Sequence, residues 1–218
     1  MNIENIFDDI SFKVSPKDDY RSSYKFRFIK SFYKIFKKEK NYVFDNCIIN
    51  KEKIDLDLRK ELIKIDSMST YAIGYLINRI CKNLSKNQVY LNIGCWKGFS
   101  LVAGMINTQC KVIGVDNFSQ FTGPKNDFIK NFENSKKSNH FFFEQDYEKY
   151  FKSLDLTKDK FDFYFYDGEH SYDNQFKNLE IADNFLNVGS LVLIDDINFD
   201  EVYAVSYTHL TLPTRCLG

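Results

Sequence analysis

The sequence predicts an α/β fold built on a doubly wound parallel sheet. Between residues 89 and 194, five short apolar runs alternate with helix-like stretches, which is the pattern of parallel strands joined by crossover helices. Glycine and aspartate follow several of these runs, as expected where strands end at a ligand-binding edge. The length of 218 residues suffices for one such domain with an appendage.

The strands and helices of this core follow in order along the chain. The expected strands are Val89–Ile93, Val112–Val115, Phe141–Phe143, Phe161–Tyr166 and Leu191–Ile194. The expected helices between them are Phe99–Ile106, Pro124–Phe132, Tyr147–Leu154 and Asn174–Phe185. Pro124 suits the first turn of its helix, because a main-chain N–H is not needed there. Asn187–Gly189 is expected to form the turn before the last strand.

Upstream of the first strand, apolar residues at helical spacing predict a helix that leads directly into the sheet. They are Met68, Tyr71, Ala72, Tyr75, Leu76 and Ile80. Ser67, Ser69 or Thr70 can cap this helix by accepting a hydrogen bond from a main-chain N–H of its first turn. We therefore place the core at residues 67–205 and a helical N-terminal extension at residues 1–66.

Residues 20–40 of the extension predict a basic amphipathic helix. They hold eight Lys or Arg residues and one Glu, with Tyr24, Phe28 and Phe32 recurring on one face. Such a helix can bind an anionic membrane, an RNA backbone or an acidic acceptor. We favour the alternative that its aromatic face packs on the domain or on a second subunit, which predicts a homo-oligomer formed through N-terminal helices.

The composition excludes several classes of protein. Thirty basic and thirty acidic residues give a net charge of zero, so no global field favours nucleic acid as a partner. No apolar run approaches the roughly 20 residues of a membrane span, and the N-terminus lacks a signal-peptide pattern, which predicts a cytoplasmic protein. Five widely spaced cysteines without a CxxC pair fit neither a disulfide framework nor a zinc site.

Residues 206–218 differ in composition from everything before them. They contain no Lys, Asn, Ile, Phe, Asp or Glu, the residues that dominate the rest of the chain. The string also resembles the translation of a sequencing adapter, so we interpret it as a non-native tail and exclude it from fold reasoning. The alternative is a genuine polar tail.

A glycine turn and an acidic residue end the first two strands. Gly94 allows a sharp turn, and Gly98 lets the next helix start close to a ligand, so that main-chain N–H groups can face an anionic group. Asp116 follows the second strand, twenty-two residues beyond Gly94, which is the spacing of a carboxylate that binds ribose hydroxyls. A dinucleotide fingerprint would need glycines where Trp96 and Phe99 stand, which counts against NAD.

These residues resemble those of a class I S-adenosylmethionine (SAM)-dependent methyltransferase, near the small bacterial macrocin-type O-methyltransferase families. The similar stretches are Leu91–Gly98, Gly114–Ser119 with Gly123 and Pro124, Phe165–Tyr172, and Gly189–Asp196. The resemblance implies a Rossmann-like sheet, and that sheet would be truncated after the fifth strand, because such enzymes continue with two more strands. The chain departs from the family pattern at Asn92, where an acidic residue is usual, and at Trp96, which replaces the middle glycine.

The resemblance also implies roles for single residues. Gly94 and Gly98 would hold the methionine part of SAM, near Asn92, and Asp116 with the adjacent Asn117 would hold the ribose. Asp146, just after the third strand, would lie near the adenine, although it can equally cap the next helix. Asp167 would border the cofactor where the fourth strand ends.

Asp167, Asp195 and Asp196 end the fourth and fifth strands, which are neighbours in a sheet of this type. Three carboxylates on one rim would raise one another's pKa unless a cation lay among them, and such oxygen ligands suit Mg²⁺. The resemblance agrees, since metal-dependent O-methyltransferases place metal ligands at these strand ends. The alternative is structural, because Asp167-Gly168 also suits a turn and Asp196 can cap a helix.

The expected function is SAM-dependent methylation of a small-molecule or sugar hydroxyl, with assistance by a divalent cation as one alternative. Methyl transfer requires alignment and removal of a proton from the acceptor. His170 and Glu169, directly after the fourth strand, are the candidate bases. One alternative is a catalytically inactive nucleotide-binding or interaction protein of the same fold, and another is an NAD-dependent oxidoreductase.

Overall fold

The computed structural model describes residues 10–12, 47–49, 55–120 and 124–196 of the 218-residue chain. The expected basic helix at 20–40 and the tail at 206–218 lie outside the described residues. Among the helices of the described part, none is long and apolar enough to cross a membrane.

The main sheet has five parallel strands in the order β5-β4-β3-β6-β7. If the five strands are numbered along the chain, this is the order 3-2-1-4-5 of a doubly wound sheet. The order in which successive strands are added reverses beside β3. The strands are β3 (Val89–Ile93), β4 (Lys111–Asp116), β5 (His140–Glu144), β6 (Phe161–Tyr166) and β7 (Leu186–Ile194). The predicted fold class is confirmed, and the bounds of β3 and β6 agree with the sequence analysis.

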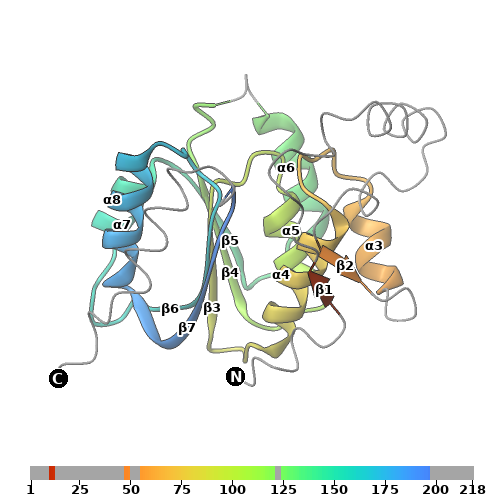
Figure 1. The fold of residues 1–218 in the computed structure, drawn as a ribbon, viewed down its shortest axis with the longest axis horizontal. Coiled ribbons are helices and arrows are strands. Elements are labelled where there is room, and N and C mark those ends of the chain that lie inside the picture. The colour runs from red at the N-terminus through yellow and green to blue at the C-terminus, as the bar shows by residue number, and fades with distance from the viewer. Residues whose placement is uncertain (1–9, 13–46, 50–54, 121–123, 197–218) are drawn as a thin grey trace.

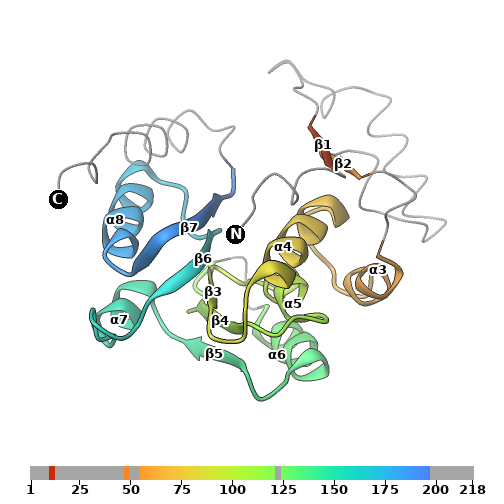
Figure 2. The ribbon, with the colours of Figure 1, turned by 90° about the horizontal axis from the view of Figure 1, so that it is seen from below.

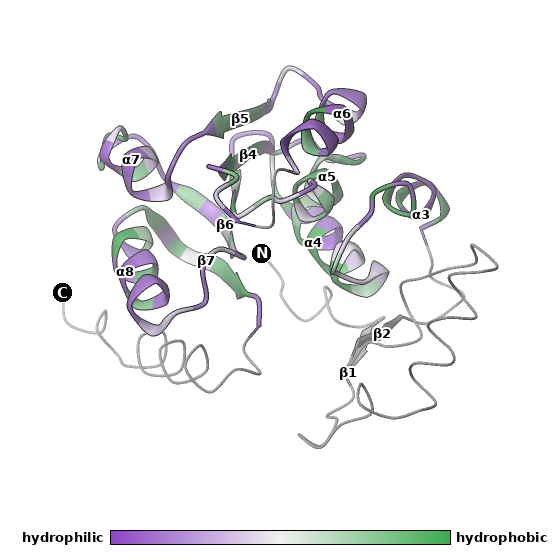
Figure 3. Ribbon diagram, turned by 90° about the horizontal axis from the view of Figure 1, so that it is seen from above, coloured by the Kyte–Doolittle hydropathy of each residue, from purple (hydrophilic) through white to green (hydrophobic). Residues whose placement is uncertain are grey.

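Helices cover both faces of this sheet, as Figures 1 and 2 show. The helices on one side are α4 (Tyr71–Asn83), α5 (Phe99–Met105) and α6 (Lys125–Ser135), with α3 (Leu56–Leu62) outside them. Those on the other side are α7 (Tyr147–Lys152) and α8 (Tyr172–Asp183). Most residues of α6 are hydrophilic (Figure 3), and α6 and α7 each bury two aromatic residues.

Strand β3 divides its side chains between two hydrophobic cores. Leu91 and Ile93 belong to the core under α7 and α8. Tyr90 points the other way, into the core under α4 and α5, where its ring stacks on Phe163 at 4.6 Å between centroids. This alternation is the period of two that a strand imposes, and it places Asn92 on the same side of the sheet as Tyr90.

Helix α4 begins after Thr70, whose side chain accepts a hydrogen bond from the Ile73 N–H. The predicted cap is therefore confirmed at Thr70. Met68 was expected on the helix, but it precedes the cap and is largely exposed.

The thiol-bearing residues Cys81, Cys95 and Cys110 are buried and free.

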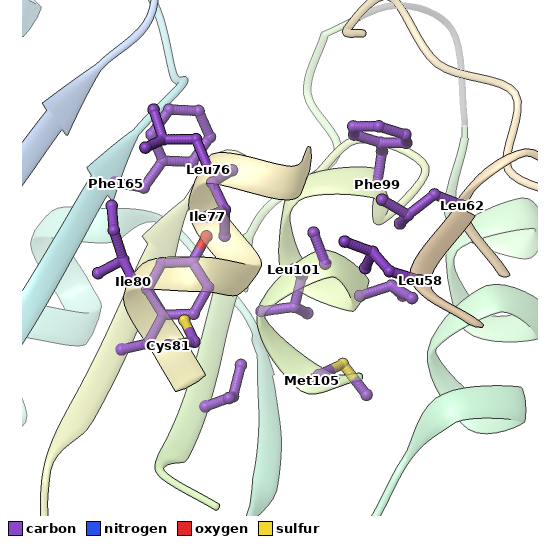
Figure 4. Packing of buried hydrophobic residues seen from close by; sticks show 14 of the residues in the cluster. Leu58, Leu62, Leu76, Ile77, Ile80, Cys81, Phe99, Leu101, Met105 and Phe165 are labelled. Atoms are coloured by element: carbon purple, nitrogen blue, oxygen red, sulfur yellow. The ribbon is translucent and has the colours of Figure 1, made fainter. Parts of the chain in front are cut away.

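The N-terminal extension is not wholly helical. Strand β1 (Ile10–Phe12) pairs antiparallel with β2 (Cys47–Ile49), which corrects the expectation for residues 1–66. Helix α3 begins after its cap, Asp55, and buries Leu58 and Leu62. Figure 4 shows both leucines directed toward Phe99, Leu101 and Met105, so α3 shares the core of the sheet domain.

The predicted turn at Asn187–Gly189 is wrong, because these residues belong to β7. Leu186 pairs with Phe161 and Leu191 pairs with Phe163, so the extra residues of β7 are accommodated as an irregularity of the strand pair. Gly189 has a positive φ of 80° within this irregularity, a conformation that glycine adopts without steric cost.

Candidate functional site

A cleft of about 780 Å³, open to solvent, lies at the carboxyl ends of β3, β4, β5 and β6. Its walls are the connections that follow these four strands, including the glycine loop Gly94–Gly98 after β3. This is the edge at which open parallel sheets bind ligands, beside the strand where the order reverses.

The glycine loop passes close to the main chain of Asp167 at Gly94, which has a φ of 80°. A Cβ atom there would lie 2.0 Å from the main-chain oxygen of Asp167, so only glycine fits. Gly98, with a φ of 92°, directly precedes α5. Gly94 borders the cleft, as expected for a residue that lets a main chain pass near a ligand, whereas Gly98 does not border it.

The N–H groups of this loop are not directed at a ligand, in contrast to our expectation. Gly94 donates to the Val115 oxygen and Gly98 donates to the Cys95 oxygen. The N–H groups of Cys95 and Trp96 both donate to Oδ2 of Asp116, at 2.7 and 2.8 Å. These four N–H groups are therefore already paired within the protein. What the loop offers a ligand is the space left by the missing side chain at Gly94.

Asp116 ends β4 and borders the cleft, as the sequence predicts. Its Oδ2 holds the glycine loop, and its Oδ1 accepts the N–H of Phe118 at 2.7 Å. A carboxylate has about four acceptor sites, so capacity for a ligand hydroxyl remains. Asn117 also borders the cleft, where its side chain accepts the N–H of Ser119.

Asn92 does not border the cleft. Its side chain is fully buried beneath the glycine loop, where Nδ2 donates to the Gly94 oxygen at 2.9 Å and Oδ1 accepts from the Ser100 hydroxyl at 2.7 Å. The expected contact with the cofactor is therefore replaced by a supporting role. The strand alternation that puts Asn92 on the Tyr90 side of the sheet was the available signal.

Asp146 has one of the two roles left open for it, that of a helix cap, and its position leaves the role near the adenine a prediction. It caps α7, since its Oδ1 accepts the N–H of Glu148 at 2.9 Å, and it also borders the cleft. Beside it, burial and the nearby carboxylates of Glu148, Asp146 and Glu169 raise the pKa of Tyr147 to about 12. The phenol therefore stays protonated at neutral pH and donates to Asn174 at 3.4 Å.

The acidic residues at the ends of β6 and β7 gather around one imidazole. His170 Nε2 lies 3.3 Å from Oδ2 of Asp196 and 3.8 Å from Oδ1 of Asp167. The Asp195 N–H donates to the Tyr166 oxygen, which fixes the start of this segment beside β6. Burial, followed by the neighbouring carboxyls of Asp195 and Asp196, raises the pKa of Asp167 well above its usual range.

The residues predicted to bind a metal lie near one another, but they do not form a metal-binding arrangement. In residues 55–120 and 124–196, no group of three or more His, Cys, Asp or Glu side chains could hold an ion. Asp167, Asp195 and Asp196 are therefore not assembled as a three-ligand site in this structure, and metal binding by them stays a prediction.

The two candidate bases occupy different positions. Glu169 is exposed and borders the cleft, and its main-chain oxygen accepts a hydrogen bond from the Tyr166 hydroxyl at 2.8 Å. His170 lies behind it, partly buried between the carboxylates of Asp167 and Asp196. Its Nδ1 is buried and has no hydrogen-bond partner among the described residues.

The lining of the cleft is acidic and aromatic. Its carboxyl groups are those of Asp116, Asp146, Glu148, Asp167 and Glu169. Of the described residues that line it, none is Lys or Arg. Such a lining favours a ligand with positive charge.

Sequence reasoning did not find every residue of the site. The aromatic wall formed by Trp96, Phe118, Tyr147 and Tyr166 was not predicted, although Trp96 was noted as a departure from the family pattern. Each follows or ends a strand at the same edge of the sheet, so their positions along the chain were the available signal. Lys97 and Asp66, which contact each other beside the loop, carried no such signal.

Solved structures with a similar fold contain a bound cofactor or SAH. Cofactor-bound Rv0187 from MTB is 14% identical, with a TM-score of 0.56, over 73% of this chain and 80% of that chain. SAH-bound methyltransferase PaMTH1 of Podospora anserina is 16% identical, with a TM-score of 0.55, over 85% and 73%. An O-methyltransferase from Bacillus cereus in complex with SAH is 13% identical, with a TM-score of 0.54, over 73% and 81%.

At these identities the structural likeness establishes the fold alone. No curated protein matches the sequence. The family model described as a methyltransferase domain matches residues 91–197, which run from β3 to just past the end of β7 and include the cleft residues after each strand. This chain therefore carries a class I SAM-dependent methyltransferase domain.

Proposed function

We propose that this methyltransferase transfers the methyl group of SAM to a hydroxyl of a small molecule or a sugar. The observation that carries the cofactor assignment is the acidic lining of the cleft, which holds five carboxyl groups and, among its described residues, no Lys or Arg. Because the protonated form of Asp167 is favoured and Glu148 is paired with Lys177, the attraction for a cation comes from the other three. SAM bears a positive sulfonium and an ammonium group, whereas NAD bears two phosphates. The lining therefore favours SAM and disfavours a dinucleotide.

The cleft residues fit the parts of SAM. Asp116 has the acceptor capacity to receive ribose hydroxyls, with Asn117 beside it. The absence of a side chain at Gly94 leaves room for the methionine part, and Asp146 borders the cleft with Tyr147, where an adenine could rest. Asp167 also borders the cleft, and we assign it to the sulfonium end of the cofactor.

When bound, SAM supplies an electrophilic methyl group on a sulfonium sulfur, which passes to the acceptor by in-line displacement. The residues of the protein align the acceptor and remove its proton. Glu169 borders the cleft and can accept that proton directly from a hydroxyl. His170, held by Asp196 at 3.3 Å, is the second candidate and requires its imidazole to reach the acceptor.

The metal-assisted form of the reaction is not part of this proposal. Asp167, Asp195 and Asp196 have no metal-binding arrangement among the described residues, so no step is routed through an ion. A small molecule or a sugar fits the cleft as acceptor, because the wall contains both aromatic rings and carboxylates, which contact rings and hydroxyls respectively.

Calorimetric titration of SAH and of NAD into the protein tests the cofactor assignment. Binding of SAH without binding of NAD is the expected result, and the reverse would refute it. Transfer of radiolabelled methyl from SAM to a panel of catechols, phenols, sugars and amines then tests the acceptor class. Methylation of amines alone would contradict the O-methyltransferase proposal, and no transfer to any acceptor would favour a binding protein that lacks turnover.

The base is tested with Glu169→Gln and His170→Asn on the best acceptor of that panel. Loss of a general base lowers kcat by about 10²- to 10⁴-fold, while the affinity for SAH should change little. If Glu169→Gln retains full kcat and His170→Asn does not, the base is His170. If both variants retain full kcat, neither residue is the base.

A further inference from the structure

Lys97 makes contacts with three separate parts of the chain beside the glycine loop. Its Nζ lies 2.9 Å from Oδ2 of Asp66, in the connection between α3 and α4. It also lies 3.3 Å from Oδ2 of Asp127 on α6. The same ammonium lies 4.8 Å from the ring centroid of Trp96, which is within the range of a cation–π contact.

Trp96 is a wall of the cleft and has little freedom in its main chain. It adopts a φ of 46°, an uncommon conformation for a residue with a side chain. Its N–H donates to Asp116, so the backbone at this position is fixed from the cleft side. The direction of the indole then depends on what packs on its ring, which the ammonium of Lys97 contacts.

Lys97 itself is held at both ends. Its main-chain oxygen accepts a hydrogen bond from Nδ2 of Asn131 on α6, at 2.9 Å. Its side chain is 19% exposed, whereas those of Asp66 and Asp127 are 65% and 62% exposed. The side chain of Lys97 therefore lies against its surroundings, beside the indole, while two largely exposed carboxylates pair with its ammonium.

The charge of Lys97 is maintained by these partners. The hydrogen bond to Asp66 is the main cause that raises the pKa of the ammonium above its ordinary value. Each ion pair alone would contribute little, because exposed pairs are screened by water and salt. Two carboxylates that share one ammonium restrict its position more than either would alone.

We propose that Lys97 is a positioning residue for cofactor binding, which holds the Trp96 indole in place as a wall of the cleft. Asp66 and Asp127 anchor it. Asp66 lies outside the methyltransferase match at residues 91–197, so the connection that follows α3 contributes to the cofactor site. This inference rests on the proposed function, in that the cleft is taken to bind SAM and SAH.

The test uses Trp96 as its own reporter, because it is the only tryptophan of the chain. Lys97→Met removes the charge but keeps an unbranched side chain, and Lys97→Arg keeps the charge. In Lys97→Met we expect a red-shifted Trp96 emission, easier quenching by acrylamide, and about three- to tenfold weaker SAH binding by calorimetry. Lys97→Arg should restore SAH binding to within about twofold, because guanidinium also contacts aromatic rings.

Lys125→Met is the matched control. Lys125 makes an exposed ion pair with Glu144 at 2.7 Å, on the same helix as Asp127 but without bordering the cleft. It should leave both the emission of Trp96 and the affinity for SAH unchanged. SAH binding by Lys97→Met within about twofold of the unchanged chain would overturn the proposal, and so would a failure of Lys97→Arg to restore it.

If Lys97→Met does not fold, the double variant Asp66→Asn/Asp127→Asn removes the anchors and leaves Lys97 in place. It should show the same weakening, and unchanged SAH binding would overturn the proposal. If the unchanged chain fails to bind SAH, the proposed function fails. The ligand-free emission of Trp96 in Lys97→Met and Lys97→Arg then still decides whether Lys97 positions the indole.

Discussion

Oδ2 of Asp116 lies 2.8 Å from the main-chain nitrogen of Trp96. The same oxygen also receives the N–H of Cys95, at 2.7 Å. A residue expected to bind the ribose thus also ties the glycine loop to the end of β4. The loop and its acidic partner are one unit in the ligand-free protein.

We predict that Asp116→Asn weakens both the fold and cofactor binding. An amide has one acceptor oxygen, so it cannot serve both the loop and the Phe118 N–H, and a buried donor is left without a partner. The expected cost is about 1–3 kcal/mol in the free energy of unfolding, with at least about tenfold weaker SAH binding. Urea unfolding and calorimetry measure the two effects. Asp173→Asn on the exposed surface of α8 is the control, and equal behaviour of the two variants would contradict the prediction.

A second prediction separates steric cost from conformational cost at two glycines. Gly94 and Gly189 both have a φ of 80°, but a Cβ at Gly94 would lie 2.0 Å from the Asp167 oxygen, whereas a Cβ at Gly189 would meet nothing within 4 Å. Gly189→Ala should therefore cost only about 1–2 kcal/mol, the penalty of the left-handed conformation. Gly94→Ala should cost more than about 4 kcal/mol, because the loop must move. Equal midpoints of urea unfolding for the two variants would contradict the prediction, because they would show that the loop moves at little cost in free energy.

A third prediction follows from the raised pKa of Asp167. Burial and the neighbouring carboxyls of Asp195 and Asp196 favour its protonated form in the folded protein. Its contribution to stability is therefore complete below its unfolded pKa and is lost as the pH rises through the folded value. Asp167→Asn has no such loss, so it should be more stable than the unchanged chain at pH 8, with the difference disappearing near pH 4.

Urea unfolding of both proteins from pH 4 to pH 8 measures this difference. Asp155→Asn is the control of opposite sign, because hydrogen bonds from Thr157 lower the pKa of Asp155. That variant should lose stability at neutral pH relative to acid. The prediction for Asp167 would be contradicted if Asp167→Asn were less stable than the unchanged chain at pH 8. Stability gained at the cost of the site is the usual result where a functional residue is strained by its surroundings.

Much of this fold could be predicted from the sequence, because strands of a buried parallel sheet are short continuous apolar runs. The bounds of Val89–Ile93 and Phe161–Tyr166 are examples. The segment Asn187–Gly189 was misread because it carries turn residues, and only pairing with Phe161 and Phe163 shows that a strand can absorb them. The pattern of residues within one segment does not show which residues of a neighbouring strand it will pair with.

The site divides in the same way. Asp116, Asp146 and Asp167 were predicted at the cleft because their positions follow directly from where strands end. The hydrogen bonds of Asp116 to the loop could not be predicted, since they depend on side-chain directions in three dimensions. Nor could the contact between Asp66 and Lys97, which joins residues 31 positions apart through an otherwise unremarked connection.

The last prediction concerns His140, far from the cleft at the start of β5. Its side chain is buried, Nδ1 accepts the Lys137 N–H at 3.1 Å, and Nε2 has no hydrogen-bond partner among the described residues. Burial, with the nearby charge of Lys137, lowers its pKa to about 4. The neutral imidazole therefore contributes stability that is present above the unfolded pKa of about 6.5 and is lost as the pH falls toward 4.

His140→Asn keeps an acceptor for the Lys137 N–H but cannot titrate in this range. Between pH 7 and pH 4.5, the unchanged chain should lose on the order of 2–3 kcal/mol more in its free energy of unfolding than this variant. The carboxylates are common to both proteins, so the difference isolates the imidazole. Parallel pH profiles for the two proteins in urea unfolding would mean that His140 gains a proton in the fold without cost, and its burial would then carry no pH dependence.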